Sequence, residues 1–103
     1  MVSREANVLI LGQFTGFDWD EGNRGKNQRL HDVSDAECEQ IFFNQPLLTL
    51  PDEEHANGEA RYLALGRTDR GRRLAAIFTT RQDRLRVISA RDMTKRERTL
   101  YPR

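Results

Sequence analysis

Residues 84–101, RLRVISARDMTKRERTLY, predict a β-strand that leads into a short helix, and both segments carry closely spaced basic side chains. The apolar alternation changes phase inside the strand, since Leu85 and Val87 occupy odd positions whereas Ile88 and Ala90 occupy even ones. Side chains of a regular strand alternate between the two faces of a sheet. The strand is therefore either covered on both faces or contains a β-bulge near Val87–Ile88.

The bulge decides where Arg86 and Arg91 point. On a regular strand, residues an odd number of positions apart face opposite sides of the sheet. One bulge between the two arginines would bring both to the same face, where their planar guanidinium groups could bind a single phosphate. The pattern thus indicates an anion site, with an ordinary solvated basic surface as the alternative.

The short helix after this strand has its own start signal. Thr94 and Glu97 have the spacing of a capping box, and Glu97 shares a helix face with Tyr101. Lys95 and Arg96 occupy the first turn, where the helix dipole disfavours positive charge. A bound phosphate would remove that penalty, so this turn also points to an anion.

Further strands are expected upstream. Residues 61–66 and 74–80 are apolar segments separated by a TDRG turn at 68–71, and residues 81–83 form the turn into the last strand. Consecutive strands with such short links form an antiparallel meander. A shorter strand is expected at 47–50. These segments predict an antiparallel β-sheet in the second half of the chain.

A helix is expected at residues 34–43. Ser34 and Glu37 form a capping box, and Val33 with Cys38 has the spacing of a hydrophobic staple. Both signals place the start of this helix at Ser34.

The preceding segment is less regular. Phe17 and Trp19 have the parity of a short strand and could both face the core. Asp20 could cap a helix that runs through residue 31, but two interior glycines would each cost about 1 kcal/mol. Propensity alone does not establish this helix.

Length and composition indicate one domain. The 103 residues allow one modest core, and 37% hydrophobic with 32% charged residues is typical of a globular protein. We expect residues 14–103 to form the domain and residues 1–13 to form an extension, in which Asn7–Gln13 could add a strand. The single cysteine excludes an internal disulfide, and no apolar run approaches the roughly 20 residues that span a bilayer. A cytoplasmic location without a membrane segment is expected.

Charge is unevenly distributed along the chain. Residues 1–59 contain four Lys and Arg against twelve Asp and Glu, net −8, whereas residues 60–103 contain thirteen against four, net +9. This asymmetry favours a polyanionic partner such as RNA for the second half. The alternative is that the two halves pair with each other in space.

The sequence predicts no metal and no cofactor. His31 and His55 are far apart, and no Cys-x-x-Cys or HExxH spacing occurs. Cys38 lies at an apolar helical position, where a buried and inert thiol is expected. Glu59 and Arg61 flank a strand start and are expected to form a structural ion pair.

Several motifs resemble the BrnT toxin family of type II toxin–antitoxin systems, and they cover nearly everything from Phe17 onward. The motifs are FDWDEGN at 17–23, Lys26-Asn27, His31-x-Val33-Ser34, Ala36 with Phe42, Pro46, PDEEH at 51–55, Gly58-Glu59-x-Arg61-Tyr62, Leu65-Gly66, RVISAR at 86–91, and Thr94-Lys95-x-Glu97-x-x-x-Tyr101. The chain departs from the family at residues 30–33, which read LHDV where Lys-His-Gly-Val is usual.

This resemblance implies an α+β, RelE-like fold, in which two N-terminal helices pack on an antiparallel sheet and a short helix follows the last strand. It supports the helix before residue 31 that propensity leaves open. It also implies a ribonuclease that inhibits translation and is neutralised by a BrnA-type antitoxin in a hetero-oligomer. Contacts with operator DNA would be made by the antitoxin.

A metal-independent ribonuclease would use the 2′-hydroxyl of its RNA substrate as the nucleophile. The roles follow from residue type: Arg86 and Arg91 bind the phosphate, Lys95, Arg96, Arg98 and Ser89 contact the RNA, and Glu97, Tyr101, His31 and His55 are candidates for proton transfer. A glutamate among arginines stays ionised and suits a base better than an acid. The competing hypothesis is a non-catalytic module, or degenerate toxin, that binds nucleic acid or a partner with the same surface.

Overall fold

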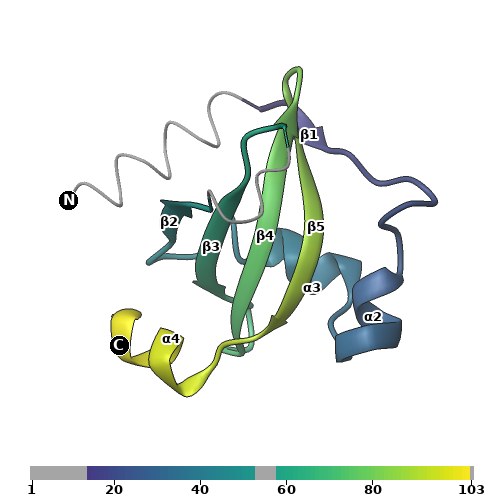
Figure 1. The fold of residues 1–103 in the computed structure, drawn as a ribbon. Coiled ribbons are helices and arrows are strands. Elements are labelled where there is room, and N and C mark those ends of the chain that lie inside the picture. Colours follow the sequence, from purple (N-terminus) through teal and green to yellow (C-terminus); the bar gives the residue numbers. More distant parts are fainter. Residues whose placement is uncertain (1–13, 53–57, 103) are drawn as a thin grey trace.

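The computed structural model describes residues 14–52 and 58–102, which fold into a five-stranded sheet with three short helices (Figure 1). In chain order the elements are β1 (Gly16–Phe17), α2 (Lys26–His31), α3 (Asp35–Gln40), β2 (Leu48–Pro51), β3 (Tyr62–Arg67), β4 (Arg73–Arg81), β5 (Arg84–Asp92) and α4 (Lys95–Leu100). The strand order is β1-β5-β4-β3-β2. The expected strand at residues 7–13 lies outside the described residues. No helix within the described ranges is long and apolar enough to cross a membrane.

The meander predicted for the second half is confirmed, because β2, β3, β4 and β5 pair in sequence and antiparallel. The prediction of a purely antiparallel sheet is wrong, since β1 pairs with β5 in the parallel direction. Local alternation can predict a strand but carries no information on its direction. That direction is set by the long connection through α2 and α3 that separates β1 from the meander.

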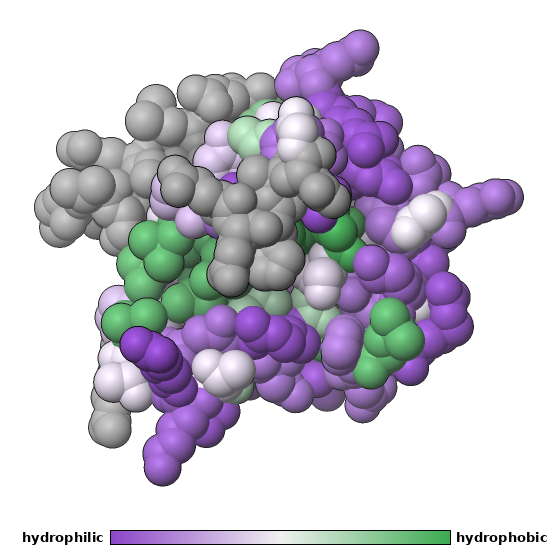
Figure 2. Space-filling model, in the orientation of Figure 1, coloured by the Kyte–Doolittle hydropathy of each residue, from purple (hydrophilic) through white to green (hydrophobic). Residues whose placement is uncertain are grey.

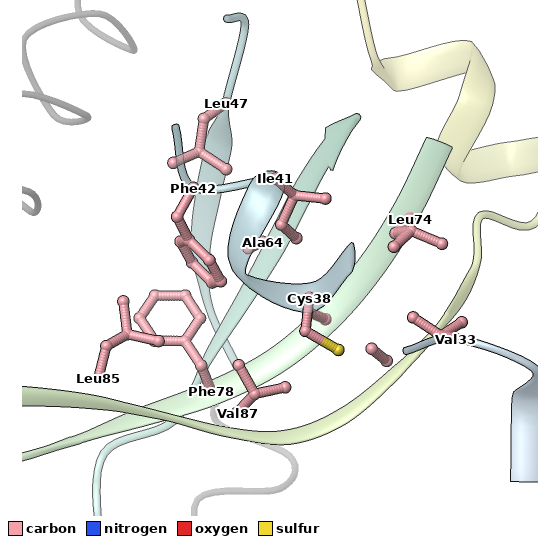
Figure 3. Packing of buried hydrophobic residues seen from close by; sticks show 12 residues of the cluster. Val33, Cys38, Ile41, Phe42, Leu47, Ala64, Leu74, Phe78, Leu85 and Val87 are labelled. Atoms are coloured by element: carbon pink, nitrogen blue, oxygen red, sulfur yellow. The ribbon is translucent and has the colours of Figure 1, made fainter. Parts of the chain in front are cut away.

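Apolar side chains cover both faces of the sheet. Between the sheet and the helices, Phe42, Ile41 and Cys38 from α3 and the turn after it meet Phe78 and Val87 from the strands (Figure 3). Phe14, Phe17 and Trp19 pack against this cluster, so the predicted burial of the last two is confirmed. The predicted strand is shorter than expected, since β1 ends at Phe17 and Trp19 follows it.

A smaller cluster covers the other face. It joins Leu65 and Ala75 of the sheet to Met93 and Tyr101, which flank α4. The central strand β4 is therefore covered on both sides, which explains its nearly continuous apolar sequence.

The β-bulge in β5 is confirmed. Phe78 lies opposite Val87 and Ile77 lies opposite Ser89, so Ile88 has no partner in the register. The phase change in the apolar pattern therefore reflects the bulge, because Leu85, Val87 and Ala90 all pack in the same cluster despite their different parity.

Helix α3 begins as predicted. Ser34 accepts a hydrogen bond from the Glu37 amide at 3.1 Å, and the Glu37 carboxylate accepts one from the Ser34 amide at 3.0 Å. The regular helix ends at Gln40, and turns continue to residue 43.

Helix α2 exists but begins at Lys26, so Asp20 is not its cap. Residues 21–25 form turns, and Gly25 adopts φ 69° immediately before the helix. A left-handed residue interrupts a right-handed helix, and glycine takes this conformation at little cost. The glycines that weaken the helical signal therefore delay the start of the helix and leave the Asp20 side chain for another contact.

Candidate functional site

The bulge places three polar residues of β5 on one face. Arg86, Ser89 and Arg91 lie opposite Thr79, Ile77 and Ala75, which alternate along β4. Ala75 belongs to the apolar cluster under α4. Both arginines and Ser89 therefore share the face that carries α4, as the bulge hypothesis requires.

Arg86 is held by the loop after β1. Its Nη2 and Nη1 donate to the two carboxylate oxygens of Asp20 at 2.9 and 3.0 Å, and Asp18 lies 3.6 Å away. The Arg86 side chain is only 11% exposed. The hydrogen bonds that Arg86 donates hold the pKa of Asp20 below its usual value, and the same bonds raise the pKa of Arg86.

Asn23 fixes this loop to the bulge. Its buried side-chain amide donates to the carbonyls of Asp18 at 2.9 Å and Val87 at 3.0 Å, and its oxygen accepts from the Asp20 amide at 2.8 Å. The FDWDEGN motif therefore places the Asp20 carboxylate against Arg86. Sequence reasoning missed these roles of Asp20 and Asn23, because both contacts span more than sixty residues.

Arg91 is held by α4. Its Nη1 and Nη2 donate to the two carboxylate oxygens of Glu97 at 2.6 and 3.0 Å, and Glu97 also caps the helix by accepting from the Thr94 amide at 2.9 Å. The hydrogen bonds from Arg91 are the main cause that lowers the pKa of Glu97. This carboxylate is ionised near neutral pH, and the predicted capping box is confirmed.

The other candidates for proton transfer lie apart from this pair. Tyr101 is buried, its hydroxyl donates to the Pro46 carbonyl at 2.5 Å, and burial raises its pKa. His31 is exposed at the end of α2, and Figure 1 shows α2 and α4 on opposite sides of the lower sheet. His55 lies outside the described residues. Of the three described candidates, the structure brings only Glu97 into contact with a phosphate-binding candidate.

Arg72 forms a centre of interactions that the sequence did not reveal. It donates to Asp92 through Nε at 2.7 Å and to the Asp32 carbonyl at 2.7 Å, and its Nη1 lies 3.3 Å from Glu37. The hydrogen bond to Asp92 is the main cause that raises the pKa of Arg72. Arg72 therefore connects the end of α2 and the start of α3 with the end of β5.

Ion pairs therefore join the acidic and basic halves, as the alternative interpretation of the charge asymmetry predicted. Asp20 neutralises Arg86, Glu37 contacts Arg72, and Glu59 lies 3.7 Å from Arg61, which confirms that structural pair. The pairing is incomplete, since the basic residues of α4 remain exposed. Figure 2 shows this hydrophilic surface in purple over α4, beside a green hydrophobic patch between α4 and β2.

Among residues 14–52 and 58–102, no group of three or more His, Cys, Asp or Glu side chains could hold a metal ion. Cys38 is fully buried, and burial raises the pKa of its thiol to about 12. A thiol with such a pKa is a poor nucleophile and a poor ligand at neutral pH.

Comparison with known families identifies a matching family. The family described as "Ribonuclease toxin, BrnT, of type II toxin-antitoxin system" matches residues 19–97, which include β5, the bulge and Glu97. No curated protein matches the chain.

Proposed function

Since the chain belongs to the BrnT family of ribonuclease toxins from type II toxin–antitoxin systems, we propose that it cleaves RNA without a metal ion and thereby inhibits translation in the cytoplasm. The family implies an RNA target and an antitoxin protein, and we propose a BrnA-type antitoxin bound in a hetero-oligomer. Contact with operator DNA would pass through that antitoxin. The α+β fold is consistent with the RelE-like superfamily, to which we assign it.

The contact between Arg91 and Glu97 is the observation that carries this proposal. A cation for the phosphate and an ionised carboxylate for the 2′-hydroxyl lie 2.6 Å apart on the face that also bears Arg86 and Ser89. Guanidinium has five N–H donors, so Arg91 can bind Glu97 and still offer donors to a phosphate oxygen. Glu97 is half-buried rather than sealed, which leaves it reachable from this face.

The reaction then follows from these groups. Glu97 accepts the proton of the 2′-hydroxyl, the 2′-oxygen forms a bond to phosphorus, and the bond to the 5′-oxygen breaks. Arg91 stabilises the additional negative charge on the phosphoryl oxygens. Arg86 lies opposite Thr79, four residues along β4 from the partner of Arg91 and so about 13 Å away along the strand, and its side chain would have to leave Asp20 to reach the same phosphate. Protonation of the leaving 5′-oxygen gives a 5′-hydroxyl, and the other product carries a 2′,3′-cyclic phosphate.

The candidates for the acid that protonates the leaving 5′-oxygen are Tyr101, His31 and His55. Tyr101 would have to release the Pro46 carbonyl before it could donate to the leaving oxygen. Ser89, Lys95, Arg96 and Arg98 contact the RNA chain on either side of the reacting phosphate. Lys95, Arg96 and Arg98 are exposed on α4, which suits this role.

Cleavage of a purified RNA in excess chelator tests the metal-free scheme. We expect unchanged cleavage, products with 2′,3′-cyclic phosphate ends, and no cleavage where the nucleotide lacks its 2′-hydroxyl. Arg91→Ala should abolish cleavage, whereas Arg70→Ala, an exposed arginine in the turn before β4, should leave it intact. Loss of cleavage on chelation would overturn the metal-free mechanism.

A non-catalytic module is the second candidate, and two observations favour it. Asp20 engages both terminal nitrogens of Arg86, and the Tyr101 hydroxyl is already bound to a carbonyl. Such a degenerate toxin would shift RNA on a gel without cutting it. Growth arrest on induction, rescued by the neighbouring antitoxin gene, would dismiss this alternative.

A further inference from the structure

A groove of about 490 Å³ lies between α4 and the start of β4, and neither Arg91 nor Glu97 lines it. It is open to solvent, and its lining residues are Arg73, Lys95, Arg98, Thr99 and Tyr101. Three of these five side chains are cationic. None of the family motifs that describe the chain includes Arg73.

The charges of this groove are not neutralised by the protein. Arg72, Arg86 and Arg91 each bind a carboxylate, whereas Arg73 and Lys95 contact none within residues 14–52 and 58–102. Arg98 donates to the Met93 carbonyl at 2.9 Å, which leaves its charge in place. The groove therefore offers cations without a carboxylate partner, whereas Arg86 and Arg91 of β5 are ion-paired.

The sheet adds a fourth cation at a cost to folding. Arg67 lies directly opposite Arg73 in the register of β3 and β4, and both are exposed. Like charges at directly opposed strand positions are destabilising. The positive charges of both arginines also lower the pKa of Tyr101, against the effect of burial, which shows that both lie near its hydroxyl. Conflict between a local preference and the fold is typical of functional or strained positions.

The lining favours a phosphate over a base. The only aromatic ring in it belongs to Tyr101, which is buried and holds its hydroxyl on the Pro46 carbonyl, so it offers no free face for stacking. Arginine and lysine side chains in an open groove recognise the backbone without reading sequence. An open groove also lets a chain pass through.

The groove continues the face that carries the candidate catalytic pair. Arg91 lies opposite Ala75, and Arg73 precedes Ala75 by two residues on the same face of β4. Two residues along a strand span about 7 Å. A single RNA strand bound at Arg91 can therefore extend into the groove.

We propose that Arg73, Lys95 and Arg98, with Arg67 beside them, bind a backbone phosphate of single-stranded RNA adjacent to the scissile one. This inference rests on the proposed function, since it adds a second phosphate site for the same substrate. The site contributes affinity for long substrates and carries no sequence preference.

The test is binding of a fluorescent, uncleavable 2′-O-methyl RNA to the full chain, measured by anisotropy over a range of salt concentrations. Arg73→Glu should weaken binding about tenfold and reduce the slope of log affinity against log salt by about 0.7 for each phosphate that the variant no longer neutralises. Arg70→Glu makes the same charge change in the adjacent turn and should leave the slope unchanged. Thermal unfolding checks the fold, and Arg73→Gln replaces Arg73→Glu if the latter is unfolded.

Equal binding by the Arg73 and Arg70 variants would overturn the groove as an RNA site. Loss of antitoxin binding with unchanged RNA binding would also overturn it, because the groove would then belong to the protein partner. A wild-type chain that binds RNA through Arg73 but never cleaves it would refute the proposed function alone. A chain that cleaves RNA with no effect of Arg73 on binding would refute this inference alone.

Discussion

Arg91 and Glu97 join the end of β5 to α4 through two hydrogen bonds, with Nη1–Oε1 and Nη2–Oε2 distances of 2.6 and 3.0 Å. The same Glu97 carboxylate caps α4 by accepting from the Thr94 amide. One side chain therefore supports the fold and is also the best-placed base for the proposed reaction. Its two roles can be separated by substitution.

Glu97→Gln should lower the rate of RNA cleavage by about 10²–10⁴-fold, since the amide cannot accept the 2′-hydroxyl proton. RNA binding should persist, because the cations of the face remain. Thr94→Ala is the matched control: it removes the Thr94 half of the capping box at a cost of about 1 kcal/mol and keeps the carboxylate. Wild-type cleavage by Glu97→Gln, measured on a labelled RNA, would remove Glu97 from the mechanism.

Acid should destabilise the fold through the carboxylates that arginines bind. Contacts with Arg86, Arg72 and Arg91 lower the pKa values of Asp20, Asp92 and Glu97 in the folded state. A lowered folded-state pKa stabilises the protein above the unfolded value, and that stability is lost as pH falls through the folded value.

The melting temperature should therefore be nearly constant from about pH 6 to 8 and fall below about pH 4, where these carboxylates become protonated. Thermal unfolding followed by circular dichroism measures this dependence. Glu97→Gln should show a shallower fall than wild type. An identical slope for the two proteins would show that the Glu97 ion pair contributes nothing to acid sensitivity.

Local sequence patterns predicted the features of the fold that depend on neighbouring residues. The phase change at Val87–Ile88 predicted the bulge, and the spacing of Ser34 with Glu37 predicted the start of α3. These signals depend on residues that are close in sequence, so they can be recognised without knowledge of tertiary contacts. The same reasoning misplaced the start of α2, because the hydrogen-bond partners of Asp20 lie in a distant strand.

Contacts between distant segments could not be predicted in this way. Asn23 and Asn27 stand in the recognised motifs, yet their partners, the Val87 carbonyl and the Ala90 amide, are known only from the fold. Arg72 is one basic residue among many in its segment until the ends of α2, α3 and β5 meet around it. Residue types thus predicted the kind of site, while the fold decided which cations are already neutralised.

Asn27→Ala should destabilise the protein by about 1–3 kcal/mol. The buried Asn27 oxygen accepts from the Ala90 amide at 3.0 Å, next to the bulge, and alanine would leave that buried amide without a partner. Arg29→Ala, an exposed change on the same helix, should alter stability by no more than about 0.5 kcal/mol. Urea unfolding measures both variants, and equal midpoints would contradict the proposed role of Asn27.

Gly66→Ala should cost about 1–3 kcal/mol for a different reason. A Cβ at Gly66 would lie 2.9 Å from the Ile41 Cβ and 3.0 Å from the Ile41 carbonyl oxygen, so β3 and the turn after α3 would have to separate. Gly16→Ala is the control, since a Cβ there meets no atom within 4 Å. If both variants melt at the wild-type temperature, close packing at Gly66 is not what requires glycine.

Aspartate at residue 32 should be tolerated in the backbone conformation that ends α2. Asp32 ends α2 with φ 56° and ψ 40°, the left-handed region in which glycine is usual. Aspartate visits this region more readily than most residues, and here its carboxylate accepts from the Gln28 side chain at 2.7 Å. The carbonyl of Asp32, which Arg72 binds, does not depend on the side chain.

Asp32→Gly should therefore stabilise the fold by roughly 0.5–1 kcal/mol, because relief of the left-handed strain outweighs an exposed hydrogen bond. Asp32→Ala keeps the strain and loses the hydrogen bond, so it should destabilise by about 1 kcal/mol. The expected order of melting temperatures is Gly, then Asp, then Ala. An alanine variant as stable as the glycine variant would show that the left-handed backbone imposes no cost at this position.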